Sequence, residues 1–402
     1  MKLLYISTDQ FKVEDGKTYA LPAFGNAYWQ KYLDVFDEIE VIGIPIIKSL
    51  ANGAFSELSD PRITIHILPD NSYPLDMLKY NRIIKKGLKK FIGEAEAILI
   101  KPSTTRGLMA ISIAKRLKKP YMIQITGDLW TSYKDHPNMI KRYYGAHILF
   151  RLVKSAIRDC KFGLYVSEKY LPSMYPIDGL QCGVTNSVIP EIPSNILNER
   201  IKKIDGYTLD ETMKIGLVGA YKGNRKGIDT AIKALSLIND IPIELHILAN
   251  GVEEDRLYWK QFAQKHHFDN KLFFDSPVSG VDKVLEWNTH MDLIILPSRS
   301  EGLPRCIVES ISMACPCIVS NVCGLPELVS EEWIHAPEDF HKLSELVKRM
   351  LGDKNAMREA AMTNFEHSKN YTFENLRTKR NQFLTQFREY AMKFSNYKCQ
   401  SR

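Results

Sequence analysis

Two carboxylates separated by seven residues, Glu301 and Glu309, mark the stretch where this chain concentrates its chemistry. The aliphatic run at residues 292–296 is typical of a strand buried on both faces of a parallel sheet. A helix should begin at Pro304, whose missing N–H costs nothing at a first helical position, and reach about residue 314. Glu309 then lies about 7–8 Å below the loop that holds Glu301, so one ligand can contact both. The alternative for each residue is a capping or surface glutamate.

The turn between this strand and this helix is a natural anion site. Gly302, Leu303 and Pro304 lead into a helical turn with unpaired N–H groups and the positive end of the helix dipole. Open α/β sheets bind their ligands at this position, outside the carboxyl ends of the strands. Phosphate is the expected anion, and the two carboxylates can accept hydroxyl hydrogen bonds from the same ligand.

A second loop with similar chemistry lies upstream. Residues 213–218 predict a buried strand, and residues 219–227 form a glycine-containing loop before a helix at about 228–238. The loop contains Gly219 and three cations, which are Lys222, Arg225 and Lys226. A helix start beside cations favours a diphosphate cradle. A basic, solvated loop is the alternative.

Together these motifs resemble the signature of the family-4 glycosyltransferases, retaining enzymes of the GT-B fold. Glu301 and Glu309 match its two glutamates, and residues 324–327 match its downstream Gly-x-Pro-Glu. Residues 218–227 match its Val-Gly…Lys-Gly element in part, because Ala220 occupies the place of the usual arginine.

The resemblance implies roles for these residues. Lys226, with Lys222 or Arg225 in place of the missing arginine, would act on the departing diphosphate together with the N–H groups after Glu301. Glu301 would contact the donor sugar. The further donor-binding residues it implies are Gly219, Gly302, Leu303, Pro304, Glu309 at the ribose, and Val278 beside the base.

The amino-terminal half offers fewer candidates for the acceptor or donor-sugar side. Gly25 stands at a helix start, where the resemblance implies that the chain approaches donor and acceptor. Thr126 occupies the place where many relatives carry a histidine that contacts the donor sugar. Asp128 could bind an acceptor hydroxyl, with Trp130 as a stacking platform, or could cap the following turn, and the sequence leaves both readings open.

Residues 2–8 predict a first buried strand, followed by a polar loop through Asp15 and Gly16. Thr104 should cap a helix that reaches Leu117, and residues 281–290 predict another helix. Strands and helices alternate along both halves at the spacing of doubly wound parallel sheets. With the resemblance, this predicts an α/β protein of the GT-B fold, in which two Rossmann-like domains face each other across a cleft. We expect an acceptor-binding domain at residues 1–190, a linker at 191–208 and a nucleotide-sugar-binding domain at 209–370. A carboxyl-terminal helix at 371–402 should cross back to the first domain.

Composition narrows the class further. With 402 residues and 45% hydrophobic content, the chain can bury two cores. No apolar run reaches the roughly 18 residues of a membrane span, and the start turns polar too early for a signal peptide, so we expect a cytoplasmic protein. Seven cysteines without framework spacing favour reduced thiols in the core. Because the sequence has no Asp-x-Asp and no convincing histidine cluster, we expect neither a metal nor a cofactor.

The net charge of +7 is unevenly distributed, with basic clusters at residues 79–90, 115–119 and 141–158. A helix at 77–91, where apolar residues alternate with lysines, suits contact with an anionic membrane, and a solvated basic face is the equal alternative. Nucleic acid is not an expected partner, because no binding module accompanies the charge.

The combined prediction is a metal-independent, retaining hexosyltransferase of polysaccharide biosynthesis. It would move a sugar from a nucleotide-diphosphate donor, UDP-linked in preference to GDP-linked, to a glycan or polyprenyl-linked acceptor at the inner face of the plasma membrane. Two other classes stay open, a catalytically silent nucleotide-sugar-binding partner and a GT-B sugar epimerase or phosphorylase.

Overall fold

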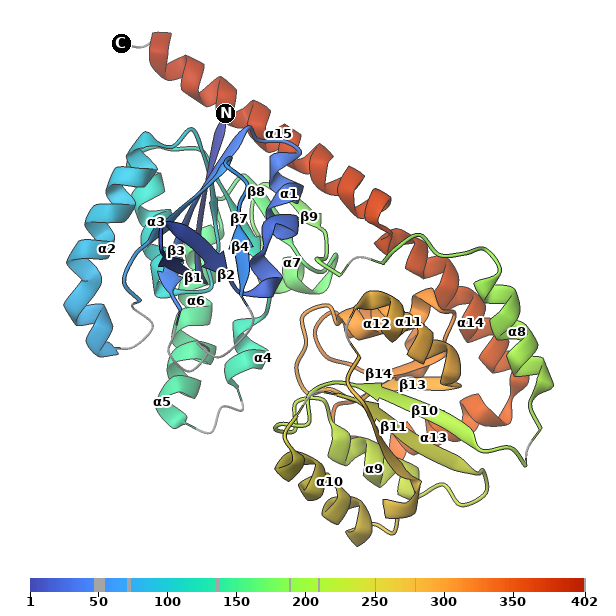
Figure 1. The fold of residues 1–402 in the computed structure, drawn as a ribbon. Helices are drawn as coiled ribbons and strands as arrows, with labels where there is room; N and C mark the ends of the chain where they lie inside the picture. Colours follow the sequence, from blue (N-terminus) through green and yellow to red (C-terminus); the bar gives the residue numbers. More distant parts are fainter. Residues whose placement is uncertain are drawn as a thin grey trace. The chain divides into compact units, whose positions relative to one another are not determined.

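The computed structural model describes residues 1–46, 55–70, 74–134, 138–187, 189–208, 210–249, 251–278 and 280–400. The chain divides into two compact units (Figure 1). Unit 1 contains Met1–Val184 and Arg377–Arg402, and unit 2 contains Thr185–Leu376. Each unit is a largely parallel sheet with helices on its faces, as predicted.

The sheet of unit 1 has the strand order β4-β2-β1-β6-β7-β8-β9, with β3 beside β1 and β5 beside β3. The pairings of β2 with β1 and with β4 are antiparallel, and the other pairings of this sheet are parallel. The chain leaves β1 for β3 and β5 on one side and then returns to β6 on the other, which puts the topological switch point between β1 and β6. The strands are β1 Lys2–Glu14, β2 Lys17–Ala20, β3 Glu38–Pro45, β4 Ser56–Leu58, β5 Ile63–Ile67, β6 Ala97–Ile100, β7 Tyr121–Ile125, β8 Phe162–Tyr165 and β9 Leu180–Gly183.

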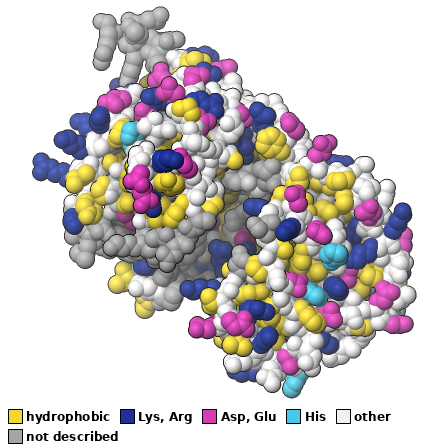
Figure 2. All heavy atoms as spheres, in the orientation of Figure 1, with side chains coloured by type: hydrophobic (Ala, Val, Ile, Leu, Met, Phe, Trp, Pro, Cys, Tyr) yellow, Lys and Arg dark blue, Asp and Glu magenta, His cyan; other side chains and the backbone are white. Residues whose placement is uncertain are grey.

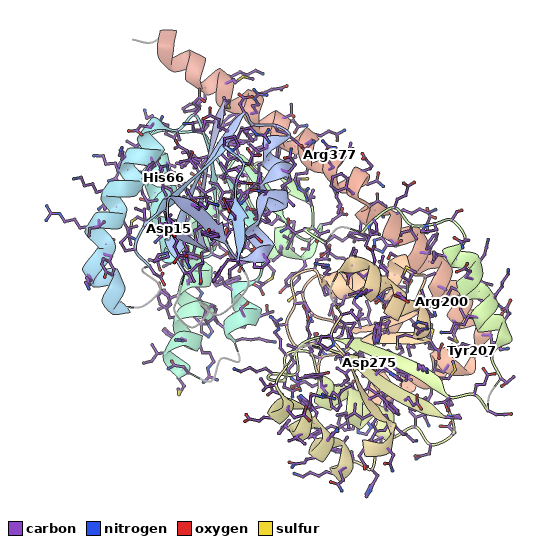
Figure 3. All side chains as sticks on the ribbon, viewed as in Figure 1. Asp15, His66, Arg200, Tyr207, Asp275 and Arg377 are labelled. Atoms are coloured by element: carbon purple, nitrogen blue, oxygen red, sulfur yellow. The ribbon has the colours of Figure 1, made fainter. Side chains whose placement is uncertain are left out.

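The predicted polar loop after the first strand is wrong. β1 continues to Glu14 and turns back into β2 through Asp15 and Gly16, which have φ angles of 50° and 74° (Asp15 is labelled in Figure 3). An Asp-Gly pair adopts these left-handed conformations readily and closes a two-residue hairpin.

One face of this sheet is covered by α2, α3 and α6, whose buried residues include Ile84, Ile111 and Val153. The helices of unit 1 are η1 Pro22–Phe24, α1 Asn26–Leu33, α2 Pro74–Glu94, α3 Thr105–Arg116, α4 Leu129–Tyr133, α5 Met139–Arg142, the π-helical segment Tyr143–Leu149, α6 Phe150–Ile157 and α7 Tyr170–Met174. Thr104 caps α3, as predicted, by accepting a hydrogen bond from the N–H of Gly107.

The long last helix, α15 (Phe373–Gln400), completes unit 1 beside α1 (Figure 1). Phe387 is buried with its ring 5.5 Å from that of Phe162 and 6.5 Å from that of Phe36. Arg377 (labelled in Figure 3) also pairs with Asp34 at 2.9 Å. The prediction that a carboxyl-terminal helix crosses back to the first domain is thus confirmed.

The sheet of unit 2 is entirely parallel, in the order β12-β11-β10-β13-β14-β15, and its switch point lies between β10 and β13. Buried side chains of β10, α9, β11, α13 and α14 form the main core. The strands are β10 Met213–Val218, β11 Ile243–Leu248, β12 Leu272–Asp275, β13 Leu293–Leu296, β14 Cys317–Ser320 and β15 Ile334–His335. The helices are α8 Ile196–Gly206, α9 Ile228–Ser236, α10 Glu253–Lys265, η4 Asp269–Lys271, α11 Val281–His290, α12 Arg305–Ser312, η5 Leu325–Glu327, η6 Glu331–Trp333, α13 Phe340–Gly352, α14 Lys354–Ser368 and η7 Lys369–Tyr371.

Residues 191–208, predicted as a linker, instead contain α8, which belongs to unit 2. The buried Arg200 (labelled in Figure 3) donates hydrogen bonds to the carbonyls of Met291 at 2.6 Å and Asn288 at 3.0 Å. These bonds fix α8 to the end of α11, so the segment is an integral part of the fold. The proline-rich approach to α8 concealed its helical periodicity.

Among the described helices, none combines the length and the apolar character that crossing a membrane requires.

Candidate functional site

Two loops meet at the carboxyl edge of unit 2, where the neighbouring strands β10 and β13 end. They comprise residues 219–227 and 297–304. Gly227 has a φ of 71°, and a Cβ atom there would lie 2.0 Å from the carbonyl oxygen of Pro297. The N–H of Arg299 donates to the carbonyl of Arg225 at 2.8 Å. The two loops therefore form one continuous surface at the switch point, where doubly wound sheets bind ligands.

The central contact of this surface joins Lys226 to Glu301. Nζ of Lys226 lies 2.7 Å from Oε1 of Glu301, and the hydroxyl of Ser298 donates to the same oxygen at 2.8 Å. The lysine side chain is 13% exposed and the glutamate 8%. A Cβ atom on Gly219 would lie 2.5 Å from Cγ of Lys226, so the glycine makes room for the lysine stem. The structure thus brings together the two residues predicted to act on the donor.

The helix that follows, α12, begins one residue later than predicted. Pro304 is its N-cap residue, with an extended ψ of 123°, and no side chain caps the first turn. The helix ends at Ser312, because Ala314 turns into the left-handed region with a φ of 53°. The first-turn N–H groups of α12 are available to an anion.

Glu309 lies in the body of α12 and is almost completely buried. Its Oε1 accepts a hydrogen bond at 2.7 Å from Nε of Arg305, whose side chain is 61% exposed. Burial raises the pKa of Glu309, and the guanidinium of Arg305 opposes that shift. The partner of the buried carboxylate is therefore an exposed arginine side chain and not a residue of the core. A pair of ligand hydroxyls can take the place of this guanidinium.

Sequence reasoning missed Arg299, which clamps the two loops together. Its guanidinium makes a bidentate pair with Asp229 at 2.8 and 2.9 Å, contacts Glu338 at 2.5 Å and donates to the carbonyl of Asn224 at 2.7 Å. Burial alone would raise the pKa of Asp229, but the hydrogen bonds and charge of Arg299 hold it below the ordinary value. The partners are 70 positions apart, so only the fold reveals the clamp.

The other predicted donor residues surround this pair. Lys222 and Arg225 are exposed on either side of Gly223, while Leu303 and Val278 are half-buried. The carbonyl of Gly302 accepts from the N–H of Gly324 at 2.9 Å. The Gly-x-Pro-Glu turn is thereby joined to the loop that holds Glu301. Ser279, which follows Val278, lies outside the described residues.

Of the two roles left open for Asp128, the structure shows the cap. This buried residue is the N-cap of α4, and its carboxylate accepts from the N–H groups of Trp130 and Thr131 at 3.1 Å. It also accepts from the hydroxyls of Tyr170 at 2.8 Å and Tyr175 at 2.9 Å. Four donors satisfy the carboxylate without a ligand, so its role is structural.

The remaining predicted residues of unit 1 lie around the ends of its strands. Thr126 is exposed directly after β7. Trp130 is partly exposed, with its ring edge-on to His147 at 5.3 Å. Gly25 is the N-cap of α1 in ordinary extended conformation, and a Cβ atom there would make normal contact with Ser56. Their roles toward donor and acceptor stay predictions.

Another charged pair, absent from the sequence prediction, marks the switch point of unit 1. Nζ of Lys101, just after β6, lies 2.8 Å from Oδ2 of Asp9 on β1. Both side chains are largely buried, and the register of β1 against β3 shifts between Ile6 and Gln10, next to Asp9. Bulges of this kind often re-aim a side chain next to a functional site. This pair replaces Asp128 as the candidate polar contact of unit 1.

In the described part of the chain, no three His, Cys, Asp or Glu side chains are grouped as a metal site would require. The six described cysteines are free and buried. Burial raises the pKa of Cys306, which lies on α12, to about 11. These thiols therefore act as small core residues.

Comparisons with known proteins agree with this geometry. Residues 212–353, which carry both loops, match the family described as glycosyl transferases group 1. Protein CapJ of Staphylococcus aureus is 27% identical over 395 residues, which are 97% of this chain and 96% of CapJ. The O-antigen biosynthesis glycosyltransferase WclY of Escherichia coli is 30% identical over 107 residues, 27% of this chain and 28% of WclY.

The fold is that of GT-B glycosyltransferases. The crystal structure of Anabaena HepE in complex with UDP-glucose superimposes with a TM-score of 0.60 at 14% identity, covering 96% of this chain and 100% of HepE. Over residues 212–353 the chain is thus similar to group 1 glycosyltransferases, and the relatives that it matches include a glycosyltransferase named for O-antigen biosynthesis.

Proposed function

We propose that this protein is a retaining glycosyltransferase that moves a sugar from a nucleotide-diphosphate donor to a glycan or polyprenyl-linked acceptor. The observation that carries the proposal is the pair formed by Lys226 and Glu301 beside the uncapped start of α12. It combines a cation, a carboxylate and helical N–H groups at one switch point. A diphosphate and the hydroxyls of a sugar need this set of groups.

Lys226 has the central electrostatic role in this proposal. The bond between the anomeric carbon and the phosphate oxygen breaks, and negative charge builds on the β-phosphate of the donor. Lys226, with Lys222 or Arg225, and the first N–H groups of α12 stabilise this charge by roughly 3–4 kcal/mol for each well-placed donor. Because the chain itself supplies the positive charge, the proposed transfer needs no metal ion.

Glu301 and Glu309 hold the donor in the proposed complex. Glu301 exchanges its hydrogen bond from Lys226 for hydroxyls of the sugar, and Glu309 exchanges Arg305 for the ribose diol. Val278 then lies beside the base. The acceptor oxygen bonds to the anomeric carbon on the face that the phosphate leaves, and its proton passes to the departing phosphate oxygen. This course retains the configuration of the anomeric carbon.

The relatives and the charge of the chain support the proposed acceptor class and location. WclY is named for O-antigen biosynthesis, and the basic clusters of this chain suit an anionic surface. We therefore propose a role in polysaccharide biosynthesis on the cytoplasmic face of the plasma membrane, with a UDP-sugar as the donor.

A panel of UDP- and GDP-sugars tested by thermal unfolding checks donor binding. The true donor at a hundred times its Kd stabilises the protein by about 2.7 kcal/mol. Glu309→Gln is the matched variant, expected to lose at least tenfold in donor affinity. Its own stability should not fall, because burial disfavours the charged form of Glu309. A variant with unchanged affinity would remove Glu309 from the site.

Product analysis then tests the reaction. Incubation of the bound donor with candidate acceptors should give a product whose anomeric configuration matches that of the donor, with or without a metal chelator. Donor binding without transfer to any acceptor would instead assign a silent binding partner. A changed sugar without acceptor, or a sugar phosphate formed with inorganic phosphate, would assign an epimerase or a phosphorylase.

A further inference from the structure

One surface of unit 1 exposes apolar side chains that neither the fold nor the proposed donor site explains. Residues 139–157 form one continuous helical rod made of α5, the π-helical segment and α6. One side of the rod is held in unit 1 by the buried residues Ala146, Leu149, Val153 and Ile157. Gly145 lies so close to Tyr133 that a Cβ atom there would meet the tyrosine ring at 2.2 Å. The rod is therefore firmly seated on the rest of unit 1.

Another side of the same rod faces solvent with large hydrophobic residues. Their exposed fractions are 72% for Met139, 79% for Ile140, 63% for Tyr143, 40% for Ile148 and 49% for Leu152. Ile140, Ile148 and Leu152 belong to a row spaced by four residues, as the buried residues 145, 149, 153 and 157 do. In a regular helix such rows rotate by about 40° a step, and the wider π turn offsets part of this rotation. The π-helical segment thus reduces the rotation of both rows between residues 143 and 149.

The charge around the exposed row has one sign. Lys141, Arg142, Arg151, Lys154 and Arg158 lie between residues 138 and 158, a stretch without Asp or Glu. Figure 2 shows hydrophobic side chains beside Lys and Arg side chains at the lower tip of unit 1, where Figure 1 draws α5. An apolar row flanked only by cations matches the boundary of an anionic membrane, in which apolar groups sink among the lipids and cations meet the headgroups.

The basic helix α2, which the sequence suggested for this role, has a different construction. Its residues Ile84, Leu88 and Ile92 are fully buried in the core of unit 1. Among its side chains that the structure describes, Ile83 is the large aliphatic residue with substantial exposure. The part of the apolar face of α2 that the structure describes is therefore already covered, and the lysines of this helix form a solvated basic face.

We propose that the rod at residues 139–157 is the surface through which unit 1 docks on an anionic membrane. A second copy of this chain is a poor occupant, because two such faces would bring like charges together without an acidic partner. The inference rests on the proposed function in one respect, since an enzyme that acts on a polyprenyl-linked acceptor must reach the membrane that holds it. The binding itself requires no catalysis.

Cosedimentation of the full chain with lipid vesicles tests the proposal. The wild type should bind vesicles that contain about 30% phosphatidylglycerol, bind pure phosphatidylcholine at least tenfold more weakly, and dissociate as salt is raised. The triple variant Ile140→Ser/Ile148→Ser/Leu152→Ser and the double variant Arg142→Gln/Arg151→Gln should each bind at least tenfold more weakly. Leu257→Ser, at an equally exposed leucine of α10, and Arg82→Gln/Lys86→Gln on α2 should bind as the wild type does.

Several outcomes would overturn the assignment. The wild type could fail to bind the anionic vesicles, the triple variant could bind them as the wild type does, or only the α2 variant could lose vesicle binding. A wild-type dimer that becomes monomeric in the triple variant would assign the face to a second copy. Thermal unfolding with the donor keeps the two proposals separate, since every variant should retain donor binding. Failure of the wild type to bind any nucleotide sugar would contradict the proposed function and leave vesicle binding unaffected.

Discussion

The carboxyl edges of the two sheets use polar side chains in different ways. In unit 2, Lys226 of one loop pairs with Glu301 of the other, and Arg299 pairs with Asp229 in the first turn of α9. In unit 1, Asp128 stands after β7 but is fully bonded to the start of its own helix and to two tyrosines. A ligand can replace a partner from another loop, whereas it cannot replace the backbone of a cap. The type and position of a polar residue therefore indicate binding only when its partners are known.

The strongest test of this comparison is Lys226→Gln. The amide can still donate to Glu301 while the positive charge is lost, so kcat/KM should fall by about 10²–10³-fold with little change in stability. Steady-state transfer assays and thermal unfolding measure the two effects. Lys202→Gln, at an exposed position of α8, is the control and should keep full activity. Activity of Lys226→Gln within threefold of the wild type would place the diphosphate elsewhere.

The opposite result is expected at Asp128. Asp128→Asn removes a carboxylate that accepts hydrogen bonds from four donors. The free energy of unfolding should therefore fall by about 1–3 kcal/mol, while the KM for the acceptor stays the same. Asp9→Asn, at the switch point of unit 1, should instead raise the KM for the acceptor. Denaturant unfolding and acceptor titration distinguish the two variants. If Asp128→Asn raised the KM and Asp9→Asn did not, the contrast between the two carboxylates would be wrong.

A smaller effect is expected at the clamp. Arg299→Lys keeps the charge but loses the bidentate geometry with Asp229, so kcat/KM for the donor should fall about tenfold, or about 1.4 kcal/mol. Asp229→Asn should show a similar loss, and the double variant should lose less than the sum. Arg377→Lys, at another paired arginine, is the control. Strict additivity of Arg299→Lys and Asp229→Asn would show that the clamp does not position the loops.

The smallest effect concerns a charged cluster within the sheet of unit 2. His246 lies 3.3 Å from both Glu244 and Asp275, which is labelled in Figure 3. Burial alone would lower the pKa of His246, but the two carboxylates raise it overall. This stabilisation is complete below about pH 6.5 and disappears as the pH rises through the folded-state pKa.

Between about pH 6 and pH 9, the wild type should therefore lose more unfolding free energy than His246→Gln, as denaturant titrations at both pH values would show. Donor kinetics of the variant should not change, because His246 bonds to Glu244 and Asp275 and belongs to neither loop. Parallel pH profiles of the two proteins would contradict this assignment.

The sequence predicted unit 2 better than unit 1. The bounds of β10 and α11 agree with the structure, and the pairing of Lys226 with Glu301 fits the expectation that one ligand contacts both loops. These features depend on short-range patterns and on a recognisable signature. The clamp at Arg299 depends on a contact with Asp229, a residue far away in the sequence, which spacing does not reveal.

The errors have physical causes of the same kind. The Asp15-Gly16 hairpin carried a local signal that the polar composition of the segment concealed. For Asp128, capping and binding are equally compatible with the sequence, and only Tyr170 and Tyr175 decide between them. The exposed row of residues 139–157 has the periodicity of any packed helix, and its exposure is a property of the assembled unit.

The place of α15 determines the order in which the newly made protein can mature. Unit 2 is one uninterrupted segment, so it can fold as soon as it leaves the ribosome. Unit 1 must wait, because Phe383, Leu384 and Phe387 complete its core and are translated long after β9. Until then the nascent unit 1 lacks these three buried side chains, so the apolar surface that they cover stays exposed during synthesis.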